Sequence, residues 1–213
     1  NKSFARNFSH EMKTPLSVIQ GYADLLSDRN LKEEERLEYS QIISKETRRL
    51  ATLSKNMLLI SQLDHQVVVP KQDTFNIAEL LRNVIQTQQM MWEHKKITLN
   101  IEIEDVMITS NKELMYQIFE NLINNAIKFT EPHHTITMTL KKEESIYFSI
   151  SNPGHLTESE QKNIFQLFYI KDDQRSSQSS GVGLTLTKKM VEKLEGNIKV
   201  TSDTNHVTFD VII

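Results

Sequence analysis

The chain has 213 residues, of which 25% are charged and 38% are hydrophobic, and its net charge at pH 7 is −3. This balance fits one large folded domain or two smaller ones. The Lys and Arg residues are scattered rather than massed, so the charge gives no support for a nucleic-acid surface. Cysteine is absent, which excludes disulfides and thiolate metal sites and is typical of a reducing compartment.

No apolar run approaches the roughly 20 residues that a membrane-spanning helix needs, and no signal peptide is recognisable. The chain begins "NKSFARNF", without Met and already in a helical pattern. We therefore expect it to be a piece of a longer protein, with any membrane segments lying outside it.

The N-terminal third of the chain carries helical periodicity and almost no strand signal. Residues 4–26 have apolar side chains in steps of three and four, which predicts one buried stripe. Residues 27–30 interrupt this helix, and residues 31–64 resume a helix with acids at its start. Because a hairpin of two helices has little core of its own, we expect a four-helix bundle with a second copy. The residues of the first stripe are Phe4, Phe8, Met12, Leu16, Ile19, Ala23 and Leu26.

The region beyond the hairpin mixes helices with strands. Residues 65–75 hold a β-branched run, a proline and polar residues, which indicate a linker. We therefore predict a helical domain over 1–66, a linker over 67–74 and a second domain over 75–213. The mixture predicts an α+β fold whose second domain is a two-layer α/β sandwich. The predicted helices cover 76–95, 110–130, 158–168 and 183–195, and the strands cover 97–103, 135–142, 145–152, 197–202 and 206–213.

His10 lies on the side of the first helix that faces away from the apolar stripe. Each residue turns a helix by about 100°, which puts the centre of the stripe roughly 175° from His10 and points the imidazole toward water. An exposed His usually has no special role, but Glu11 follows this one directly and Thr14 lies one turn on. An unprotonated imidazole is a nucleophile, and a neighbouring carboxylate can orient it or take its proton. Pro15 removes one backbone hydrogen bond and is expected to bend the helix.

These features favour a reacting histidine over a metal ligand, because no second ligand has suitable spacing nearby. A second polar group lies on the predicted helix over 110–130. Asn121 and Asn125 are four residues apart and share a face, with Lys128 next along. A single Asn is a common surface residue, but this set can hold Mg²⁺ through an amide oxygen and phosphates through the ammonium group.

Three of the five glycines lie in two loops. Gly154 belongs to "SNPGHL", and Gly181 and Gly183 belong to "SSGVGLTL", which opens a helix. Glycines there allow backbone N–H groups to approach a phosphate at a helix N-terminus. A GxG pattern alone also fits a flexible turn, but the concentration of glycines favours function. Residues 168–180 are polar and long enough for a lid over a nucleotide.

These stretches resemble five motifs of the sensor histidine kinases of two-component systems. "FSHEMKTPLSVIQGY" resembles the H-box of their phosphoacceptor domain, and "NLINNAIKFT" resembles their N-box. "NPG", "IFQLFY" and "GVGLTL" resemble the first glycine box, the F-box and the second glycine box. All five occur in the family order, and the resemblance covers essentially the whole chain.

The resemblance implies a phosphoacceptor hairpin followed by a Bergerat-type (GHKL) ATP-binding sandwich. It implies that His10 accepts the γ-phosphoryl group of ATP and passes it to an aspartate on the receiver domain of a response regulator. Glu11 would be the acid/base partner, Thr14 would position water when the regulator is dephosphorylated, and Asn125 would ligate Mg²⁺. The other nucleotide-binding positions that it implies are Asn121, Lys128, Phe129, Asn152, Gly154, Lys171, Arg175, Gly181, Val182, Gly183 and Leu184.

The resemblance also implies a homodimer through the hairpin and a place in the cytoplasmic part of a bacterial membrane sensor. Three residues depart from the family pattern. Asn152 replaces an Asp that accepts a bond from the adenine amino group, and its amide carbonyl can accept the same bond without the charge. Leu156 stands near the place of a further Gly in the first box, and Thr185 replaces the third Gly of the second box.

Ile170 stands where the family often has an Arg, whose role would fall to Lys171 or Arg175. We expect these differences to affect nucleotide affinity more than the fold, and we expect the site to remain functional. Two alternatives stay open. One is a non-catalytic phosphorelay or dimerisation module with a degenerate ATP site, and the other is a GHKL-type ATPase clamp that does not use His10.

Overall fold

The computed structural model describes residues 2–65, 72–170 and 181–213, and for residues 2–5, 7 and 65 it describes the backbone only. Two compact units divide the chain. One consists of Asn1–Gln62 with Gln166–Val182, and the other of Leu63–Phe165 with Gly183–Ile213. Most of the predicted linker lies outside the described residues. Among the residues described, no helix has the length and apolarity that crossing a membrane requires.

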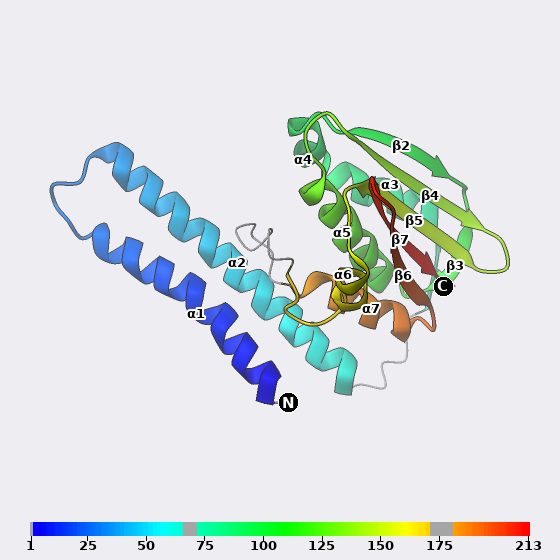
Figure 1. Ribbon diagram of the computed structural model, residues 1–213, viewed down its shortest axis with the longest axis horizontal. Helices are drawn as coiled ribbons and strands as arrows, with labels where there is room; N and C mark the ends of the chain where they lie inside the picture. Colours follow the sequence, from blue (N-terminus) through cyan, green and yellow to red (C-terminus); the bar gives the residue numbers. More distant parts are fainter. Residues whose placement is uncertain (1, 66–71, 171–180) are drawn as a thin grey trace. The chain divides into compact units, whose positions relative to one another are not determined.

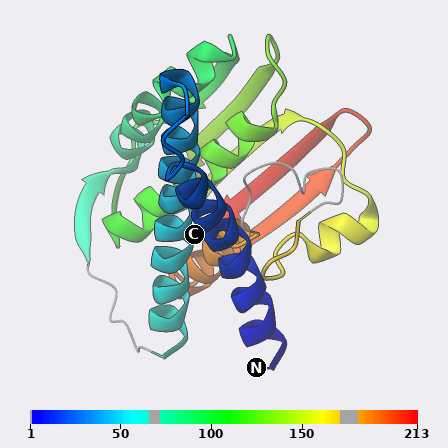
Figure 2. The same ribbon diagram turned by 90° about the vertical axis from the view of Figure 1, so that its left-hand side faces the viewer.

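The first unit contains the predicted helical hairpin. Helices α1 (Lys2–Leu25) and α2 (Glu33–His65) run side by side in opposite directions (Figures 1 and 2). The Arg36 guanidinium donates to the Asp28 carbonyl oxygen at 3.0 Å, which ties the turn to the start of α2. Three glutamates in the first turn of α2 complement the positive end of the helix dipole.

The apolar surface of the hairpin is only partly covered within one chain. Four large apolar side chains of α2 are buried, namely Leu53, Met57, Ile60 and Leu63. Four others on the two helices and their ends are at least 50% exposed, namely Leu16, Leu25, Leu37 and Leu58. Leu16 belongs to the predicted buried stripe, so a single chain does not bury that position. Covering these side chains would stabilise the hairpin by about 25 cal/mol for each Å² of apolar surface removed from water.

The second unit is built on a five-stranded sheet with strand order β2-β4-β5-β7-β6. β2 pairs with β4 in parallel, and the other pairs are antiparallel. Burial alternates along the central strands, so one face of the sheet enters the core and the other is polar. The strands are β2 (Thr98–Ile103), β4 (Thr135–Lys142), β5 (Ile146–Pro153), β6 (Asn197–Ser202) and β7 (His206–Ile212).

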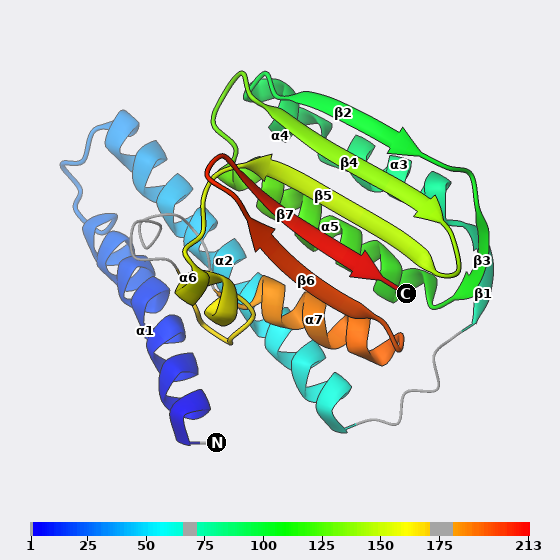
Figure 3. The ribbon, with the colours of Figure 1, turned by 45° about the vertical axis from the view of Figure 1, so that its right-hand side comes forward.

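Three helices cover the apolar face of this sheet (Figure 3). They are α3 (Ile77–Thr87), α5 (Lys112–Phe129) and α7 (Gly183–Lys193), with α5 in the middle. The ring of Phe119 on α5 meets that of Phe148 on β5 edge to face, with centroids 4.9 Å apart. The predicted two-layer arrangement of helices on a sheet is therefore confirmed.

Two short strands were not predicted. β1 (Asp73–Asn76) and β3 (Met107–Ser110) pair antiparallel in a separate two-stranded sheet. Each has four residues, which is too short to show a clear alternation in sequence. Asn76 ends β1 and caps α3, because its side chain accepts the N–H groups of Ala78 and Glu79.

Two predicted helices end earlier than expected. The helix predicted over 76–95 is wrong as a single element, because it breaks at Gln88 into α3 and α4 (Gln89–His94). The helix predicted over 158–168 stops as α6 (Glu158–Asn163). α6 begins with a complete capping box, so its start was readable in sequence, whereas its end depends on the chain that follows.

Candidate functional site

His10 is exposed on α1, as its helical position predicted. The Thr14 hydroxyl donates to the His10 carbonyl oxygen at 3.3 Å, which links these two positions through the helix backbone. Pro15 is buried, and α1 continues through it without interruption. The imidazole is therefore presented to solvent from a continuous helix.

Glu11 is held by a residue that the sequence did not reveal. Its carboxylate lies 3.7 Å from the guanidinium of Arg49 on α2, and Arg49 lies equally close to Glu46. Both Glu11 and Arg49 are about three-quarters buried, with 23% and 26% of their side chains exposed. An acidic side chain beside His10 is thus fixed by an ion pair across the hairpin. Finding Arg49 requires the register between the two helices, which no local pattern contains.

The two asparagines predicted to share a face of α5 are both half-buried. The Asn121 amide donates to the Thr187 hydroxyl at 3.4 Å, and that hydroxyl donates to the Gly183 carbonyl at 2.9 Å. Thr187 is fully buried, so it links the predicted N-box to the helix of the second glycine box. The side-chain amide of Asn125 has no hydrogen-bond partner within the described part of the chain, which leaves it available to a ligand.

Thr185 occupies the position where a glycine was expected. It is 9% exposed, and its hydroxyl donates to the Phe165 carbonyl at 2.9 Å. The Phe165 ring contacts that of Phe209 edge to face, with centroids 6.2 Å apart, and the Lys188 ammonium lies 5.7 Å from it. The larger residue is accommodated because its hydroxyl binds the F-box backbone.

The end of α5 is held by Lys95, which lies between α4 and β2. Its ammonium group donates to the carbonyl oxygens of Ile127, Lys128 and Thr130, each at 2.9 Å. The Lys128 ammonium lies 5.6 Å from the ring of Phe129. Lys95 was missed in sequence because lysine next to lysine before a strand carries no distinctive signal.

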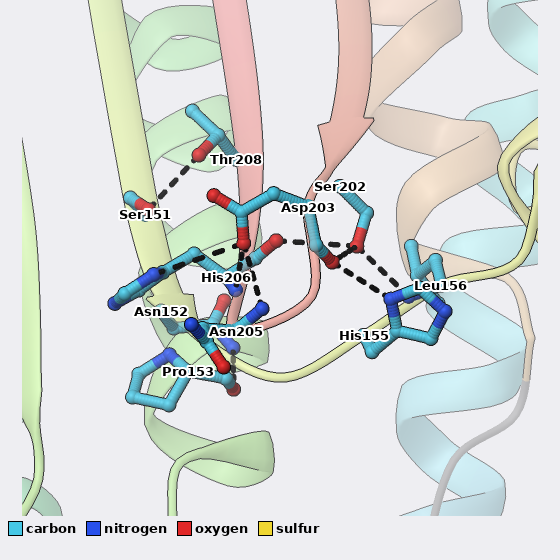
Figure 4. Close-up of polar contacts among 10 residues, drawn as sticks. All are labelled: Ser151, Asn152, Pro153, His155, Leu156, Ser202, Asp203, Asn205, His206 and Thr208. Carbon is cyan, nitrogen blue, oxygen red and sulfur yellow. Dashed lines mark hydrogen bonds and ion pairs between the residues drawn. The ribbon is translucent and has the colours of Figure 1, made fainter.

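Asn152 closes β5 and is 5% exposed. Its side-chain N–H donates to the Pro153 carbonyl at 2.9 Å, which leaves the amide oxygen as the acceptor (Figure 4). Gly154 follows with φ of +152°, a conformation that L side chains rarely adopt. The amide oxygen of this buried residue has the acceptor character that was predicted for an adenine amino group.

The loop after Asn152 is fastened to the turn between β6 and β7 (Figure 4). Three consecutive residues of the loop each contact that turn. The pairs are Gly154 N–H with the Asn205 carbonyl (2.9 Å), His155 Nδ1 with the Asp203 carbonyl (2.7 Å) and Leu156 N–H with the Ser202 hydroxyl (2.9 Å). This turn therefore sets the path of the first glycine box, and Leu156, in place of a further glycine, is buried.

The carboxylate of Asp203 shapes the turn itself. It accepts the backbone N–H groups of Asn205 and His206, each at 2.7 Å. These two bonds hold the pKa of Asp203 below its usual value. The sequence carries no signal for this role beyond an acidic residue in a turn.

Gly181 and Gly183 have different surroundings. A Cβ on Gly181, whose φ is +64°, would lie 2.6 Å from the carbonyl carbon of Phe168, whereas a Cβ on Gly183 would meet nothing within 4 Å. The Phe168 N–H donates to the Gly181 carbonyl at 2.8 Å, and Phe168 itself has φ of +65°. The backbones of Phe168 and Gly181 are therefore in direct contact, which leaves no room for a side chain at position 181.

In the rest of the second glycine box, Val182 is buried and Leu184 is half-buried. Lys171 and Arg175 lie outside the described residues. Over the described ranges, no group of three or more His, Asp or Glu residues gathers to hold a metal ion. A magnesium ion held by one amide oxygen and phosphate oxygens would not need such a group.

Two family models match the sequence. Residues 1–66 match the His Kinase A (phospho-acceptor) domain. Residues 110–213 match the Histidine kinase-, DNA gyrase B-, and HSP90-like ATPase. The first match contains His10, and the second contains the α5 asparagines and both glycine boxes.

Curated relatives include heme sensor proteins. The chain is 34% identical over 213 residues to the heme sensor protein HssS of Staphylococcus haemolyticus, which covers 99% of this chain and 46% of the relative. It is 33% identical to HssS of Staphylococcus epidermidis, covering 94% of this chain and 44% of the relative. The chain therefore spans about half the length of the curated relatives it matches.

Solved structures share the fold. The histidine kinase AdeS of Acinetobacter baumannii aligns with a TM-score of 0.81 at 18% identity, over 96% of each chain. The histidine kinase ThkA, in complex with the response regulator protein TrrA, aligns with a TM-score of 0.81 at 24% identity. That alignment covers 100% of this chain and 61% of the other. The predicted fold, a helical hairpin followed by a GHKL-type sandwich, is confirmed.

Proposed function

Because this chain belongs to the sensor histidine kinase family, we propose that it transfers the γ-phosphoryl group of ATP to His10 and then to an aspartate of a response regulator. The observation that carries the proposal is an exposed histidine, beside a fixed carboxylate, on a hairpin that matches the phospho-acceptor domain. The match of residues 110–213 to an ATPase domain supports the ATP-dependent half of the reaction.

In the first step the unprotonated ring nitrogen of His10 attacks the γ-phosphorus. A nitrogen–phosphorus bond forms, the bond from the γ-phosphorus to the bridging oxygen breaks, and ADP leaves with that oxygen. The imidazole then carries an extra proton, which Glu11 accepts. The ion pair with Arg49 keeps the Glu11 carboxylate in one place, so that it need not be ordered during the reaction.

The nucleotide site is assigned to residues of the α/β sandwich and the glycine boxes. Asn125 would hold Mg²⁺ through its amide oxygen, which fits a half-buried amide without a protein partner in the described residues. When bound, the ion offsets negative charge on the phosphate oxygens. Asn121, oriented by Thr187, and Lys128 would contact the phosphates, and the amide oxygen of Asn152 would accept the adenine amino group.

The remaining nucleotide contacts are assigned by position. Backbone N–H groups of the second glycine box face the phosphates, and Gly154 allows the base to approach the first box. Phe129 is assigned to the lining of the site, and the role of the family's Arg is assigned to Lys171 or Arg175, which lie outside the described residues. The residues assigned in the second glycine box are Gly181, Val182, Gly183 and Leu184.

The second step passes the phosphoryl group to a receiver domain. The phosphorus–nitrogen bond at His10 breaks, and an acyl phosphate forms on the regulator's aspartate. Thr14 positions water when the regulator is dephosphorylated, from a site one turn along from His10. The histidine kinase ThkA in the structural comparison is in complex with a response regulator protein, which supports this class of partner.

We place this reaction in a homodimer whose hairpins form a four-helix bundle, on the cytoplasmic side of a bacterial membrane sensor. The exposed leucines of the hairpin support the pairing, since a second copy would cover them.

Autophosphorylation tests the proposal directly. Label from the γ-phosphate of ATP should appear on the chain as an acid-labile, base-stable adduct. His10→Gln should abolish the label, whereas His94→Gln, an exposed histidine of α4, should leave it unchanged. A His10→Gln variant that still labels would contradict the assignment.

The two alternative functions, a phosphorelay module and a GHKL-type clamp, predict different results for the same chain and its His10→Gln variant. A phosphorelay module without an ATP site would bind no Mg·ATP at millimolar concentration. A GHKL-type clamp would turn over ATP steadily without a labelled protein, and His10→Gln would have no effect on that turnover.

Two further experiments define the mechanism. Mixing His10→Gln with Asn125→Ala restores labelling if transfer crosses the dimer, and leaves both variants unlabelled if it stays within one subunit. Thr14→Ala should slow regulator dephosphorylation at least tenfold while His10 still labels. Unchanged dephosphorylation would remove Thr14 from the mechanism.

A further inference from the structure

We propose that Lys95 is a positioning residue for nucleotide binding, because its ammonium group holds the backbone from which Lys128 projects. This inference rests on the proposed function, since it assumes that the end of α5 faces the phosphates. It adds a residue outside all five motifs, from the turn between α4 and β2.

The ammonium group of Lys95 uses its full donor capacity on the end of one helix. A lysine has three N–H donors, and each of the three carbonyl acceptors of Lys95 lies at 2.9 Å. The last carbonyls of a helix have no partner within it, and they carry the negative end of the helix dipole. A charged donor there makes stronger bonds than a neutral one. Thr130 caps the Ala126 carbonyl from within the sequence, through its backbone N–H and its hydroxyl. Lys95 adds a second cap, over three carbonyls that follow.

The acceptors are placed where they matter for the site. They belong to Ile127, Lys128 and Thr130, so the backbone is held on both sides of Phe129. Asn125 lies within the same final turn and a half of α5. If this turn frays, the Cα atoms of the Mg²⁺ ligand and of the phosphate-binding lysine lose their fixed separation.

Lys95 is itself fixed by its surroundings. Its carbonyl oxygen accepts the N–H of His133 at 3.0 Å, which ties it to the loop that follows α5. The next residue, Lys96, donates its N–H to the Glu93 carbonyl at 2.8 Å and has φ of +53°. The side chain of Lys95 is half-buried, whereas that of Lys96 is exposed. Two adjacent lysines therefore differ in role, and Lys96 is the matched control.

The test compares Lys95→Met, Lys95→Arg and Lys96→Met in the full chain. Two quantities are measured for each: the dissociation constant of Mg·ATP by calorimetry, and the hydrogen exchange rates of the amides in residues 127–130. Lys95→Met should weaken Mg·ATP binding about tenfold and speed exchange in 127–130 about tenfold, with α3 and α7 unchanged. Lys95→Arg keeps charged donors and should recover part of both losses, and Lys96→Met should match the wild type.

Two results would overturn the proposal. Faster exchange with an unchanged dissociation constant would mean that Lys95 stabilises the helix end without affecting nucleotide binding. Unchanged exchange would mean that Lys95 does not cap α5. If Lys95→Met does not fold, as judged by circular dichroism, Lys95→Gln, which keeps two neutral donors, takes its place in the same comparison. A wild type that binds no Mg·ATP would instead refute the proposed function, and this measurement comes first.

Discussion

The helical hairpin and the α/β sandwich place their candidate functional residues in opposite ways. On the hairpin, His10 is exposed on a continuous helix, and several leucines are at least half exposed. In the sandwich, Asn152 is 5% exposed and Thr187 is fully buried, and both are hydrogen-bonded. One region presents a histidine outward, and the other fixes polar groups within a packed core.

This difference indicates what each region needs in order to work. The sandwich has a complete core under one sheet face, so its geometry is set within one chain. The hairpin has too little buried apolar surface to fix itself strongly, so its stability should depend on a second surface. Under the proposed function this arrangement suits a phosphoacceptor, because His10 would have to meet two different partners in turn.

Removing a core side chain from the sandwich should have the largest effect. Phe119 is fully buried and contacts Phe148 at 4.9 Å between ring centroids. Phe119→Ala should lower the free energy of unfolding by about 3–5 kcal/mol, through lost burial and a cavity. Urea denaturation followed by fluorescence of the single tryptophan reports on this domain, and the loss should not depend on protein concentration. A concentration-dependent loss would mean that the sandwich is not self-sufficient.

The second largest effect is expected at the backbone contact between Gly181 and Phe168, in the second glycine box. Gly181→Ala forces a Cβ to within 2.6 Å of Phe168 backbone at φ of +64°, and should cost about 2 kcal/mol or more. This cost corresponds to roughly 30-fold faster hydrogen exchange of the Phe168 amide. Gly183→Ala, whose Cβ meets nothing within 4 Å, is the matched control and should leave that exchange unchanged. Equal effects of the two substitutions would contradict the expectation that a side chain at position 181 disrupts the contact with the Phe168 backbone.

The hairpin should respond through association instead. Leu16→Glu puts a charge on a side chain that is 50% exposed in one chain and that we expect a second copy to cover. The dimer dissociation constant, measured by analytical ultracentrifugation, should rise about tenfold or more, equivalent to about 1.4 kcal/mol. Ser17→Glu adds the same charge one residue on and should change it little. If Leu16→Glu leaves the constant unchanged, the expected stripe does not face a partner.

The sequence predicted the features that depend on local periodicity. The exposure of His10 followed from the turn angle of a helix, and the shared face of Asn121 and Asn125 followed from their spacing. The sandwich strands were found because alternation over six to eight residues is a clear signal. Glycines marked the two loops, although their separate roles needed the surrounding backbone.

The missed features all depend on contacts between distant segments. Arg49 meets Glu11 only through the register of two helices, and Lys95 reaches the end of α5 across 32 or more residues. The break at Gln88 separates two helices whose apolar pattern is continuous. The side-chain N–H of Gln88 donates to the Glu120 carbonyl at 3.2 Å, a tertiary contact that no propensity scale includes.

The smallest effects are expected from introducing a glycine in the sandwich and removing one from the hairpin. Lys96 has φ of +53°, a conformation that costs an L residue about 1–2 kcal/mol. Glycine adopts it without strain but loses more entropy on folding, so Lys96→Gly should stabilise the sandwich by a net of about 0.5–1 kcal/mol. Lys96→Ala keeps the unfavourable conformation and serves as its control. The measured quantity is the free energy of unfolding in urea.

Gly21 lies in the interior of α1, and a Cβ there meets nothing within 4 Å in the single chain. Gly21→Ala should therefore stabilise the hairpin by up to about 1 kcal/mol, through better helix propensity. Thermal melting of the helical signal at two protein concentrations measures this gain. A loss in place of a gain, growing at high concentration, would mean that the partner's helix packs directly on Gly21. The open surface of α1 would then extend beyond the leucines to the glycine itself, and dimerisation would depend on a close backbone approach.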